Sequence, residues 1–428
     1  MAIFGCIADD FTGASDAASF LVKGGLTVQL YNGIPDASVG RSDAQALVIA
    51  LKSRTQETSQ AVADTISAAK RLLSEGVQQI YFKYCSTFDS TRDGNIGPVA
   101  DALLELTGSP YTILCPALPV NGRTVKNGCL YVNGVPLHET HMRNHPLTPM
   151  WDCRLSALMQ PQSSHPCLEL SAETLAQLPA AQSGPGKGTI PKIPCCLKMP
   201  FYVIPDYTDA QDGELIASRF LALPLLTGGS GLLEPLARLW SRELGSLAQV
   251  PSSQTSGPAI LLAGSCSKAT LDQIAFYQAA GKPSYKLDPK AMLEGTQTVE
   301  DAWNFVQAHS TEGDTALVYS SDVPERVKEY QAYGIEKVAA LLEGATAQLA
   351  VRAVSAGFTR IISAGGETSG AVTKALDFST YFIGESVAPG VPLMIPCGRP
   401  DIRLVLKSGN FGQEDFFLRA LAMTKKEM

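Results

Sequence analysis

Acidic and hydroxyl side chains gather in one short turn near the start of the chain. Asp9, Asp10, Thr12 and Asp16 closely follow the apolar run at residues 3–8. Such a group can coordinate the waters of Mg2+, accept hydrogen bonds from substrate hydroxyls, or take a proton from an attacking hydroxyl. The same residue types also cap helices, but one cap needs only one of them. The excess favours a functional site, with either Asp9 or Asp10 as the catalytic carboxylate.

Three glycine-containing turns occur in the second half of the chain, each after an apolar run. They lie at residues 262–268, 360–370 and 407–412, and all three carry hydroxyl side chains. Glycines let the backbone approach a ligand, and the free N–H groups of a helix N-terminus favour phosphate. One such turn is ordinary punctuation between a strand and a helix, but three together indicate a polyphosphate site. Neither G-x-x-x-x-G-K-[ST] nor G-x-G-x-x-G occurs, which disfavours a P-loop fold and a standard dinucleotide fold.

Basic side chains accompany two further apolar runs in the first half. Lys83 and Arg92 lie at and after the run at residues 79–84, and Arg123 comes after the run at residues 111–115. These cations could hold a carboxylate, because a guanidinium fork suits bidentate contact with two oxygens. The alternative is that each is a solvated loop charge.

A run of histidines at residues 138, 141 and 145 resembles the ligand spacing of a helical metal site. Gly134 and Pro136 precede the run and Pro146 follows it, which favours a loop over a helix. We therefore expect no metal ligands here. A metal-dependent lyase or isomerase that uses His138, His141 and His145 remains the alternative within the enzymes.

Length and composition restrict the class of protein. A chain of 428 residues exceeds what one core usually supports, so two domains are expected. The 34 basic and 41 acidic residues form no long block of one sign, which predicts no nucleic-acid or anionic-membrane partner. Ten cysteines without a C-x-x-C pair indicate reduced thiols. The N-terminus lacks the pattern of a signal peptide and no apolar run reaches ~20 residues, so we expect a cytoplasmic protein.

Short apolar runs alternate with segments of helical period, which predicts an α/β fold of two domains with mainly parallel sheets. The Pro- and Ser-rich stretch at residues 248–258 is the expected linker, giving domains at 1–247 and 258–428. Residues 159–199 fit neither period and are expected to be an irregular insertion. Strands are expected near residues 3–8, 27–31, 46–51, 79–84, 111–115 and 202–204, and near 259–263, 284–287, 315–319, 360–363, 393–395 and 404–407. Ligands of such sheets bind at the carboxyl ends of the strands.

Several of these segments are similar to one known family. The chain resembles the four-carbon acid sugar kinase family from about residue 3 to residue 420. The segments that carry the resemblance are residues 7–14 (Ile-Ala-Asp-Asp-Phe-Thr-Gly-Ala), 83–90, 94–103, 119–124, 142–150, 364–372 (Ala-Gly-Gly-Glu-Thr-Ser-Gly-Ala-Val) and 407–412.

The resemblance implies an N-terminal sugar-acid-binding domain and a C-terminal nucleotide-binding domain, with both ligands in the cleft between them. It implies ATP-dependent transfer, with Mg2+, to the terminal hydroxyl of a four-carbon acid. The expected acid is 3-oxo-tetronate, with D-threonate and D-erythronate as alternatives. The expected ATP contacts are Ser265, Gly366, Glu367, Thr368, Ser369 and Gly409. The expected substrate contacts are Thr12, Asp16, Lys83, Ser86, Asp89, Arg92, Asn121 and Arg123.

The chain departs from the family pattern at residues 151–154, where Trp-Asp-Cys-Arg replaces the small polar residues expected around an aspartate, and again at residues 159–199. Both departures fall in the substrate domain, so they bear on the identity of the acid. The rival from another class is a sensor that binds a sugar acid without catalysis, although no DNA-binding segment supports it. The sequence leaves the oligomeric state open and is compatible with a homodimer.

Overall fold

The computed structural model describes residues 2–36, 39–144, 148–181, 184, 188–244, 251–310 and 314–426. The chain divides into two compact units, Met1–Gln249 and Val250–Met428, called here the N-terminal and C-terminal units. Each unit alternates parallel strands with helices, so the predicted α/β class is confirmed. The first three residues of the expected linker, 248–250, lie outside the described residues.

The N-terminal unit is built on eight parallel strands. Their order is β2 (Val28–Asn32), β3 (Ala46–Ala50), β1 (Phe4–Ala8), β4 (Gln79–Lys83), β11 (Leu225–Gly228), β5 (Tyr111–Cys115), β10 (Phe201–Pro205) and β9 (Cys167–Leu170). Every residue of β1 is buried, as expected for a central parallel strand covered on both faces. Ala8 pairs with Lys83, and Lys83 pairs with Gly228, so the carboxyl ends of β1, β4 and β11 lie level.

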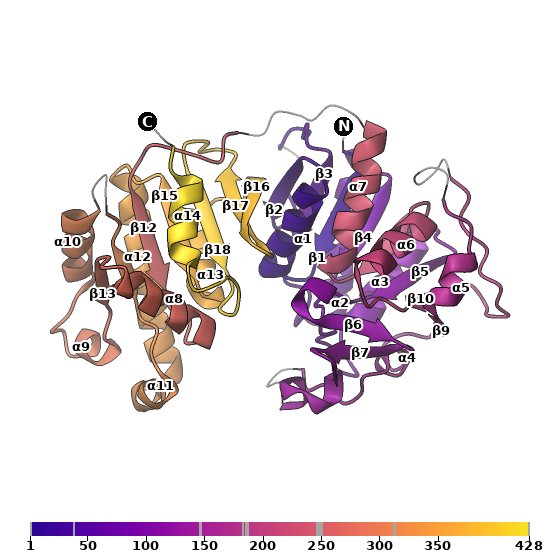
Figure 1. Cartoon of the computed structure of the whole chain (residues 1–428), viewed down its shortest axis with the longest axis horizontal. Helices are drawn as coiled ribbons and strands as arrows, with labels where there is room; N and C mark the ends of the chain where they lie inside the picture. The colour runs from indigo at the N-terminus through magenta and orange to yellow at the C-terminus, as the bar shows by residue number, and fades with distance from the viewer. Residues whose placement is uncertain are drawn as a thin grey trace. The chain divides into compact units, whose positions relative to one another are not determined.

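Helices and a small second sheet complete this unit. The helices are α1 (Phe11–Lys23), α2 (Thr58–Ser74), α3 (Ile96–Thr107), α4 (Leu155–Met159), α5 (Ala172–Gln177), α6 (Ala210–Phe220) and α7 (Leu233–Leu244). The antiparallel sheet consists of β6 (Arg123–Lys126), β7 (Cys129–Val132) and β8 (Val135–Pro136). Helices α1 and α7 pack side by side over the large sheet (Figure 1).

The C-terminal unit has five parallel strands followed by an antiparallel return. The order is β13 (Ser284–Lys286), β14 (Leu317–Tyr319), β12 (Ala259–Ala263), β15 (Arg360–Ala364), β18 (Arg403–Lys407), β17 (Val391–Pro396) and β16 (Thr380–Ala388). Ala263 pairs with Ala364 and with Tyr319, and Ala364 pairs with Lys407. The three glycine-containing turns therefore leave neighbouring strands at the same level of the sheet.

The helices of the C-terminal unit are α8 (Lys268–Ala279), α9 (Pro289–Leu293), α10 (Val299–His309), α11 (Pro324–Gln331), α12 (Ile335–Ser355), α13 (Gly366–Leu376) and α14 (Phe416–Thr424). One buried cluster joins α8 and α14 to the sheet through Tyr277, Phe416 and Phe417. In Figure 1 both helices lie over one face of this sheet. The core thus holds rigid the strand ends from which the turns emerge.

Several features differ from the sequence-based expectation. Strand β11 and the strands β6, β7 and β8 of the small sheet were not expected, because such short strands show little residue period. Strand β16 was not expected either, since it returns antiparallel to β17 in an otherwise parallel pattern. The stretch at 159–199, expected to be irregular, contains β9 and α5. The expectation of a loop around His138 is correct: residues 137–139 and 141–144 form short 3-10 turns.

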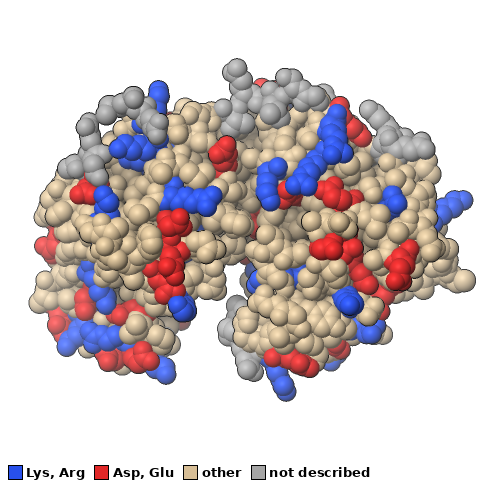
Figure 2. Space-filling view, viewed as in Figure 1, with Lys and Arg blue, Asp and Glu red and all other residues tan. Residues whose placement is uncertain are grey.

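The surface charges and the hydropathy of the helices agree with what the composition predicts. Figure 2 shows acidic and basic side chains interspersed over the described part of one face of the molecule. None of the described helices combines the length and apolar character needed to cross a bilayer.

Candidate active site

Asp9 and Asp10 share one arginine at the carboxyl end of β1. Arg54 donates from Nε and Nη2 to the two oxygens of Asp9, at 2.8 and 2.9 Å. Its Nη1 lies 2.9 Å from Oδ2 of Asp10. The Asp9 side chain is only 5% exposed and the Asp10 side chain is 34% exposed. Arg54 thus pairs with both carboxylates, of which Asp10 is the more open to a ligand.

Asp10 also caps helix α1. Its Oδ1 accepts a hydrogen bond from the backbone N–H of Gly13, with extended backbone dihedrals at the cap. The capping role and the ion pair therefore coexist in one side chain, each using a different oxygen. A cap alone would not need Arg54, so the pairing favours the functional reading of the turn.

Asp16 and Lys83 lie behind this turn and are buried. Oδ2 of Asp16 accepts a hydrogen bond from the hydroxyl of Ser230, which follows β11. A Cβ placed on Gly13 would lie 3.3 Å from Nζ of Lys83, so this ammonium sits against the start of α1. Burial raises the pKa of the Asp16 carboxyl, and the Lys83 charge opposes the rise. Burial likewise raises the pKa of Asp9, with Arg54 opposing it.

The loop after β4 carries two further expected contacts, Ser86 and Asp89, both half-buried. The Thr87 hydroxyl donates to Asp89 at 2.6 Å and lies 3.0 Å from the sulfur of Cys85. Phe88 has a φ of 52°, in the left-handed region. The loop is therefore tightly wound and holds Asp89 in a fixed orientation. The hydroxyl of Thr12, also an expected contact, belongs to the half-buried first turn of α1.

The two arginines that were expected to bind the substrate carboxylate, Arg92 and Arg123, contact different parts of the N-terminal unit. The guanidinium of Arg92 stacks on the ring of Trp151, 4.0 Å from its centroid. Both line a cavity of about 640 Å3 together with Arg143. Arg123 instead begins β6 and donates to the carbonyl of Asn121. Arg92 thus places a positive charge in the wall of this cavity, while Arg123 stabilises the turn after β5.

The sequence reading missed Arg54. This residue follows β3, and its N–H donates to the carbonyl of Asp9 at 3.4 Å. β3 pairs with β1 in parallel register, which brings the loop after β3 beside the Asp9 turn. The available signal was a basic residue shortly after a buried apolar run, the same signal that pointed to Lys83.

The glycine-containing turns of the C-terminal unit converge on Ser265. A Cβ on Gly409 would lie 2.3 Å from Oγ of Ser265, and one on Gly365 would lie 3.0 Å from its backbone nitrogen. A Cβ on Gly264 would lie 2.2 Å from the hydroxyl oxygen of Thr368. Side chains at these positions would collide, so glycine is required for the three turns to meet.

Helix α13 begins in this cradle and its first turn is open. Gly365 precedes it with a φ of 129°, and Gly366 has no heavy atom within 4 Å of an added Cβ. Glu367 is exposed, whereas Thr368 and Ser369 are buried. The N–H groups at this N-terminus, with the helix dipole, favour an anion. All six expected nucleotide contacts thus belong to one cradle.

Lys407 underlies the same cradle. Its side chain is buried, and Nζ donates to the Gly409 carbonyl at 2.9 Å and to the Thr270 hydroxyl at 2.9 Å. Burial lowers the pKa of Lys407 to about 8. The ammonium therefore fixes the Gly409 turn and places a titratable positive charge beneath it.

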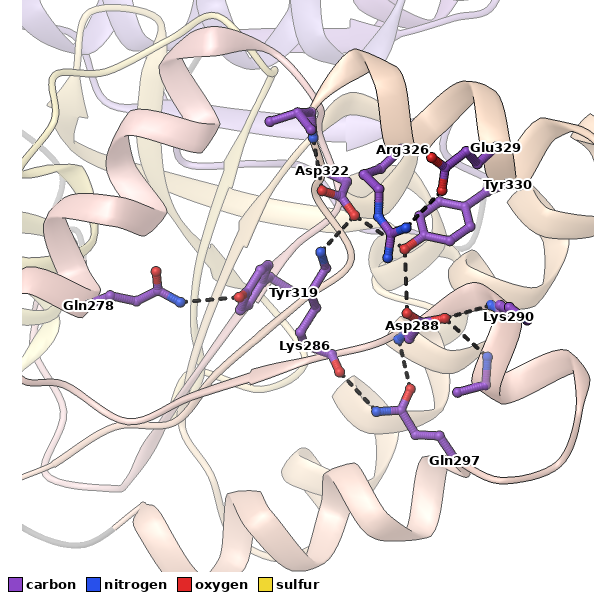
Figure 3. A network of polar contacts seen from close by, with 12 residues as sticks. Gln278, Lys286, Asp288, Lys290, Gln297, Tyr319, Asp322, Arg326, Glu329 and Tyr330 are labelled. Atoms are coloured by element: carbon purple, nitrogen blue, oxygen red, sulfur yellow. Dashed lines mark hydrogen bonds and ion pairs between the residues drawn. The ribbon is translucent and has the colours of Figure 1, made fainter.

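A polar network lies at the outer strands β13 and β14 of the C-terminal sheet. Figure 3 shows Lys286 donating to Asp322 at 2.6 Å, with the hydroxyl of Tyr330 between Asp322 and Asp288. The ion pair lowers the pKa of Asp322 although burial opposes the change. Ser320, two residues before Asp322, has its hydroxyl oxygen 3.4 Å from a Cβ on Gly264, so the segment after β14 lies beside the cradle.

His138 and His141 lie in the two 3-10 turns, and His145 falls outside the described residues. His138 is at the rim of the cavity that contains Arg92. It approaches Asp152 and Cys153, so its neighbours come from another segment and not from the run itself.

Comparisons with known proteins also distinguish two domains with different ligands. Residues 4–236 match the family described as the sugar-binding N-terminal domain, and residues 260–417 match the nucleotide-binding C-terminal domain. The 3-oxo-tetronate kinase of Brucella melitensis is 43% identical over 99% of this chain and 96% of its own length. The 3-oxo-tetronate kinase of Pseudomonas fluorescens is 43% identical over 98% of this chain and 96% of its own length.

Two solved structures share the fold over nearly their whole length. A Haemophilus influenzae protein has a TM-score of 0.82 at 38% identity, covering 98% of this chain and 99% of its own. A Salmonella typhimurium protein has a TM-score of 0.87 at 36% identity, covering 99% of this chain and all of its own. The chain therefore belongs to the four-carbon acid sugar kinase family and is a kinase with a sugar-binding and a nucleotide-binding domain.

Proposed function

We propose that this protein transfers the terminal phosphoryl group of ATP to the 4-hydroxyl of 3-oxo-tetronate, giving 3-oxo-tetronate 4-phosphate. The observation that carries the phosphate half of the proposal is the cradle around Ser265, which glycines keep clear of side chains. Relatives that are about as long as this chain and 43% identical, named 3-oxo-tetronate kinase, support the choice of acid.

The cradle fits the phosphates of a nucleotide. The space in front of Gly366 would take a phosphate oxygen, and the N–H groups of the first turn of α13 would donate to it. Ser265 and Gly409 would approach the chain of phosphates from the neighbouring strand ends. The network around Asp322 offers acceptors on the side where a nucleoside would extend.

The Asp10 carboxylate is proposed as the base at the sugar acid. The acid's terminal oxygen attacks the γ-phosphorus, the bond from this phosphorus to the β,γ-bridging oxygen breaks, and ADP leaves with that bond's electron pair. The hydroxyl proton passes to Asp10, because Asp10 is the exposed member of the pair. Arg54, itself held by Asp9, would hold Asp10 in position. Phosphoryl transfer asks mainly for this alignment and for charge neutralisation.

The remaining expected contacts would bind the acid. Arg92 in its cavity is proposed to hold the carboxylate, with Arg123 and Asn121 at the edge of the site. Mg2+ is proposed to enter with ATP, since the exposed Glu367 carboxylate beside the cradle is a ligand of the type it takes. The reaction then requires water to be excluded from the bound ligands.

An ADP-release assay with Mg-ATP tests the proposal. The panel consists of 3-oxo-tetronate, D-threonate and D-erythronate, with the site of phosphorylation read from the phosphorus–proton couplings of the product. We expect kcat/KM to be highest for 3-oxo-tetronate. A higher value for D-threonate or D-erythronate would reassign the acid and keep the kinase. Tight binding of an acid without ADP release would instead favour a sensor.

A further inference from the structure

Three metal-ligating side chains lie close together beside the cavity that contains Arg92, away from the strand-end turns, and a fourth adjoins one of them. One ligand atom each from His138, Asp152 and Cys153 lies within 4.8 Å of the other two. The sulfur of Cys129 lies 3.0 Å from that of Cys153. We propose that His138, Asp152, Cys153 and Cys129 form a binding site for a zinc-class divalent metal ion.

The backbone holds these residues together through three elements. The N–H of Leu130 donates to the carbonyl of Cys153 at 2.8 Å, and Cys129 forms a bridge with Arg154. These bonds tie β7 to the segment that carries Asp152 and Cys153. His138 comes from the 3-10 turn after β8, which packs against β7. The cluster is therefore part of the folded scaffold and not a chance approach of loop tips.

His138 and Asp152 each have a feature that suits a ligand of a cation. Nδ1 of His138 is buried and has no hydrogen-bond partner among the described residues. Such a buried imidazole nitrogen needs either a partner or an ion. Oδ1 of Asp152 accepts from the N–H groups of Cys153 and Arg154, at 2.7 and 2.9 Å, which fixes the carboxylate.

The nearest cation does not neutralise the cluster. Arg154 adjoins Cys153 in the sequence, but its Nη1 lies 2.6 Å from Oε2 of Glu169. Glu169 also accepts from the hydroxyl of Ser156, at 2.8 Å. Arg154 thus forms its ion pair with Glu169 and not with Asp152, which leaves the Asp152 carboxylate available to an ion.

The donor set selects a borderline metal. Two sulfurs, an imidazole and a carboxylate suit Zn2+, whereas Mg2+ and Ca2+ prefer oxygen alone. Two sulfurs on a tetrahedral zinc at about 2.3 Å lie about 3.8 Å apart, so Cys129 and Cys153 need to separate by only about 0.8 Å. Each thiol gives up its proton to solvent when its sulfur binds the metal.

The site also accounts for an unexplained part of the sequence. The segment at residues 151–154 departs from the family pattern, and Cys153 stands where a small polar residue is expected. Within the described structure the kinase site does not use Cys153 or Cys129. Metal binding by these cysteines together with His138 would explain why residues 151–154 depart from the family pattern.

Metal binding by the full chain tests the proposal. We expect protein prepared under reducing conditions with zinc, then desalted, to retain about one metal ion per chain. Replacement by Co2+ should give a sulfur-to-cobalt absorption band. Cys129→Ser should lower that band by about half. His138→Asn and Cys153→Ser should weaken Zn2+ binding by at least about tenfold. The control is Cys196→Ser, an exposed cysteine outside the cluster, which should bind as the wild type does.

A second measurement uses the unmodified protein, in case a variant fails to fold. Zn2+ should slow alkylation of Cys129 and Cys153, but not of Cys196, and a chelator should restore the rate. The proposal is overturned if no stoichiometric metal and no cobalt band appear. Equal Zn2+ affinity in Cys153→Ser and the wild type would overturn it too. So would a Cys129–Cys153 disulfide that forms equally fast with and without Zn2+.

Discussion

The strand ends of the N-terminal unit carry charged side chains that pair with one another, whereas those of the C-terminal unit carry glycines and hydroxyls. In the first, Arg54 bridges Asp9 and Asp10 over the buried Lys83. In the second, three turns approach so closely that a Cβ on Gly409 would meet Ser265. Both units present the carboxyl ends of parallel strands, so the difference lies in the side chains and not in the architecture.

The difference follows from the ligands each unit is proposed to bind. A sugar acid has hydroxyls and one carboxylate at fixed positions, and oriented charges recognise them one by one. A polyphosphate carries many equivalent oxygens, and backbone N–H groups at a helix start can bind them without side chains. Substitutions that change charge should therefore damage the N-terminal site most. Substitutions that add volume should damage the C-terminal site most.

The largest effect is expected from Asp10→Asn. The amide keeps the shape but cannot accept a proton, so kcat should fall by about 10²–10⁴-fold while the KM for ATP stays nearly constant. The control is Asp209→Asn, because Asp209 caps α6 through Gln211 and Asp212 as Asp10 caps α1. Steady-state rates decide the matter. If both variants lost the same small fraction of activity, Asp10 would be a cap and nothing more.

Arg54→Met should destabilise the N-terminal unit by about 3–5 kcal/mol, because it leaves the buried Asp9 charge unpaired. Burial already raises the pKa of Asp9, and loss of Arg54 removes an opposing effect. A carboxyl with a raised folded-state pKa costs stability as the pH rises through that value. The loss should therefore be smaller near pH 5 than at pH 8.

Urea unfolding of the variant at both pH values measures this loss. Adding Asp9→Asn to Arg54→Met should recover part of the stability, since the unpaired charge is gone. An equal loss at both pH values, with no recovery in the double variant, would show that Asp9 does not depend on Arg54.

Local patterns were enough to predict the residues that form each turn. The Asp9 turn and the Gly365 turn are continuous in sequence, so residue type and spacing reveal them before any fold is known. Arg54 stood out only as a basic residue after an apolar run, because its pairing with Asp9 depends on β3 lying beside β1 in the sheet. Sheet order is a non-local property and leaves little trace in a single segment.

The same limit explains the elements that were missed. β16 forms through antiparallel pairing with β17, which residue periodicity does not specify. The histidine run at residues 138–145 suggested neighbours within the run. The structure joins His138 instead to Cys153, fifteen positions later, because β7 is bonded to the segment around Cys153. Contacts across segments are fixed by topology, and only the residue types are visible in the sequence.

Gly366→Val tests the C-terminal site by volume alone. Nothing lies within 4 Å of a Cβ on Gly366, so the protein should fold normally while the added methyls fill the proposed phosphate position. The KM for ATP should rise by at least about tenfold. Gly370→Val is the matched control, because Gly370 has the same open surroundings one turn further along α13. Equal KM values in the two variants would exclude phosphate binding at Gly366.

The smallest effect is expected from the charge beneath the cradle. Burial lowers the pKa of Lys407 to about 8, so this ammonium should lose its proton as the pH rises from 7 to 9. The KM for ATP should then rise by about threefold, as a positive charge near the phosphates is lost. Lys407→Met should have a raised KM at pH 7 and no further rise by pH 9.

Lys268→Met, which removes an exposed lysine paired with Asp272 at the start of α8, should keep the wild-type pH profile. If Lys407→Met also kept that profile, the titrating group would lie elsewhere, and Lys407 would only brace the Gly409 turn.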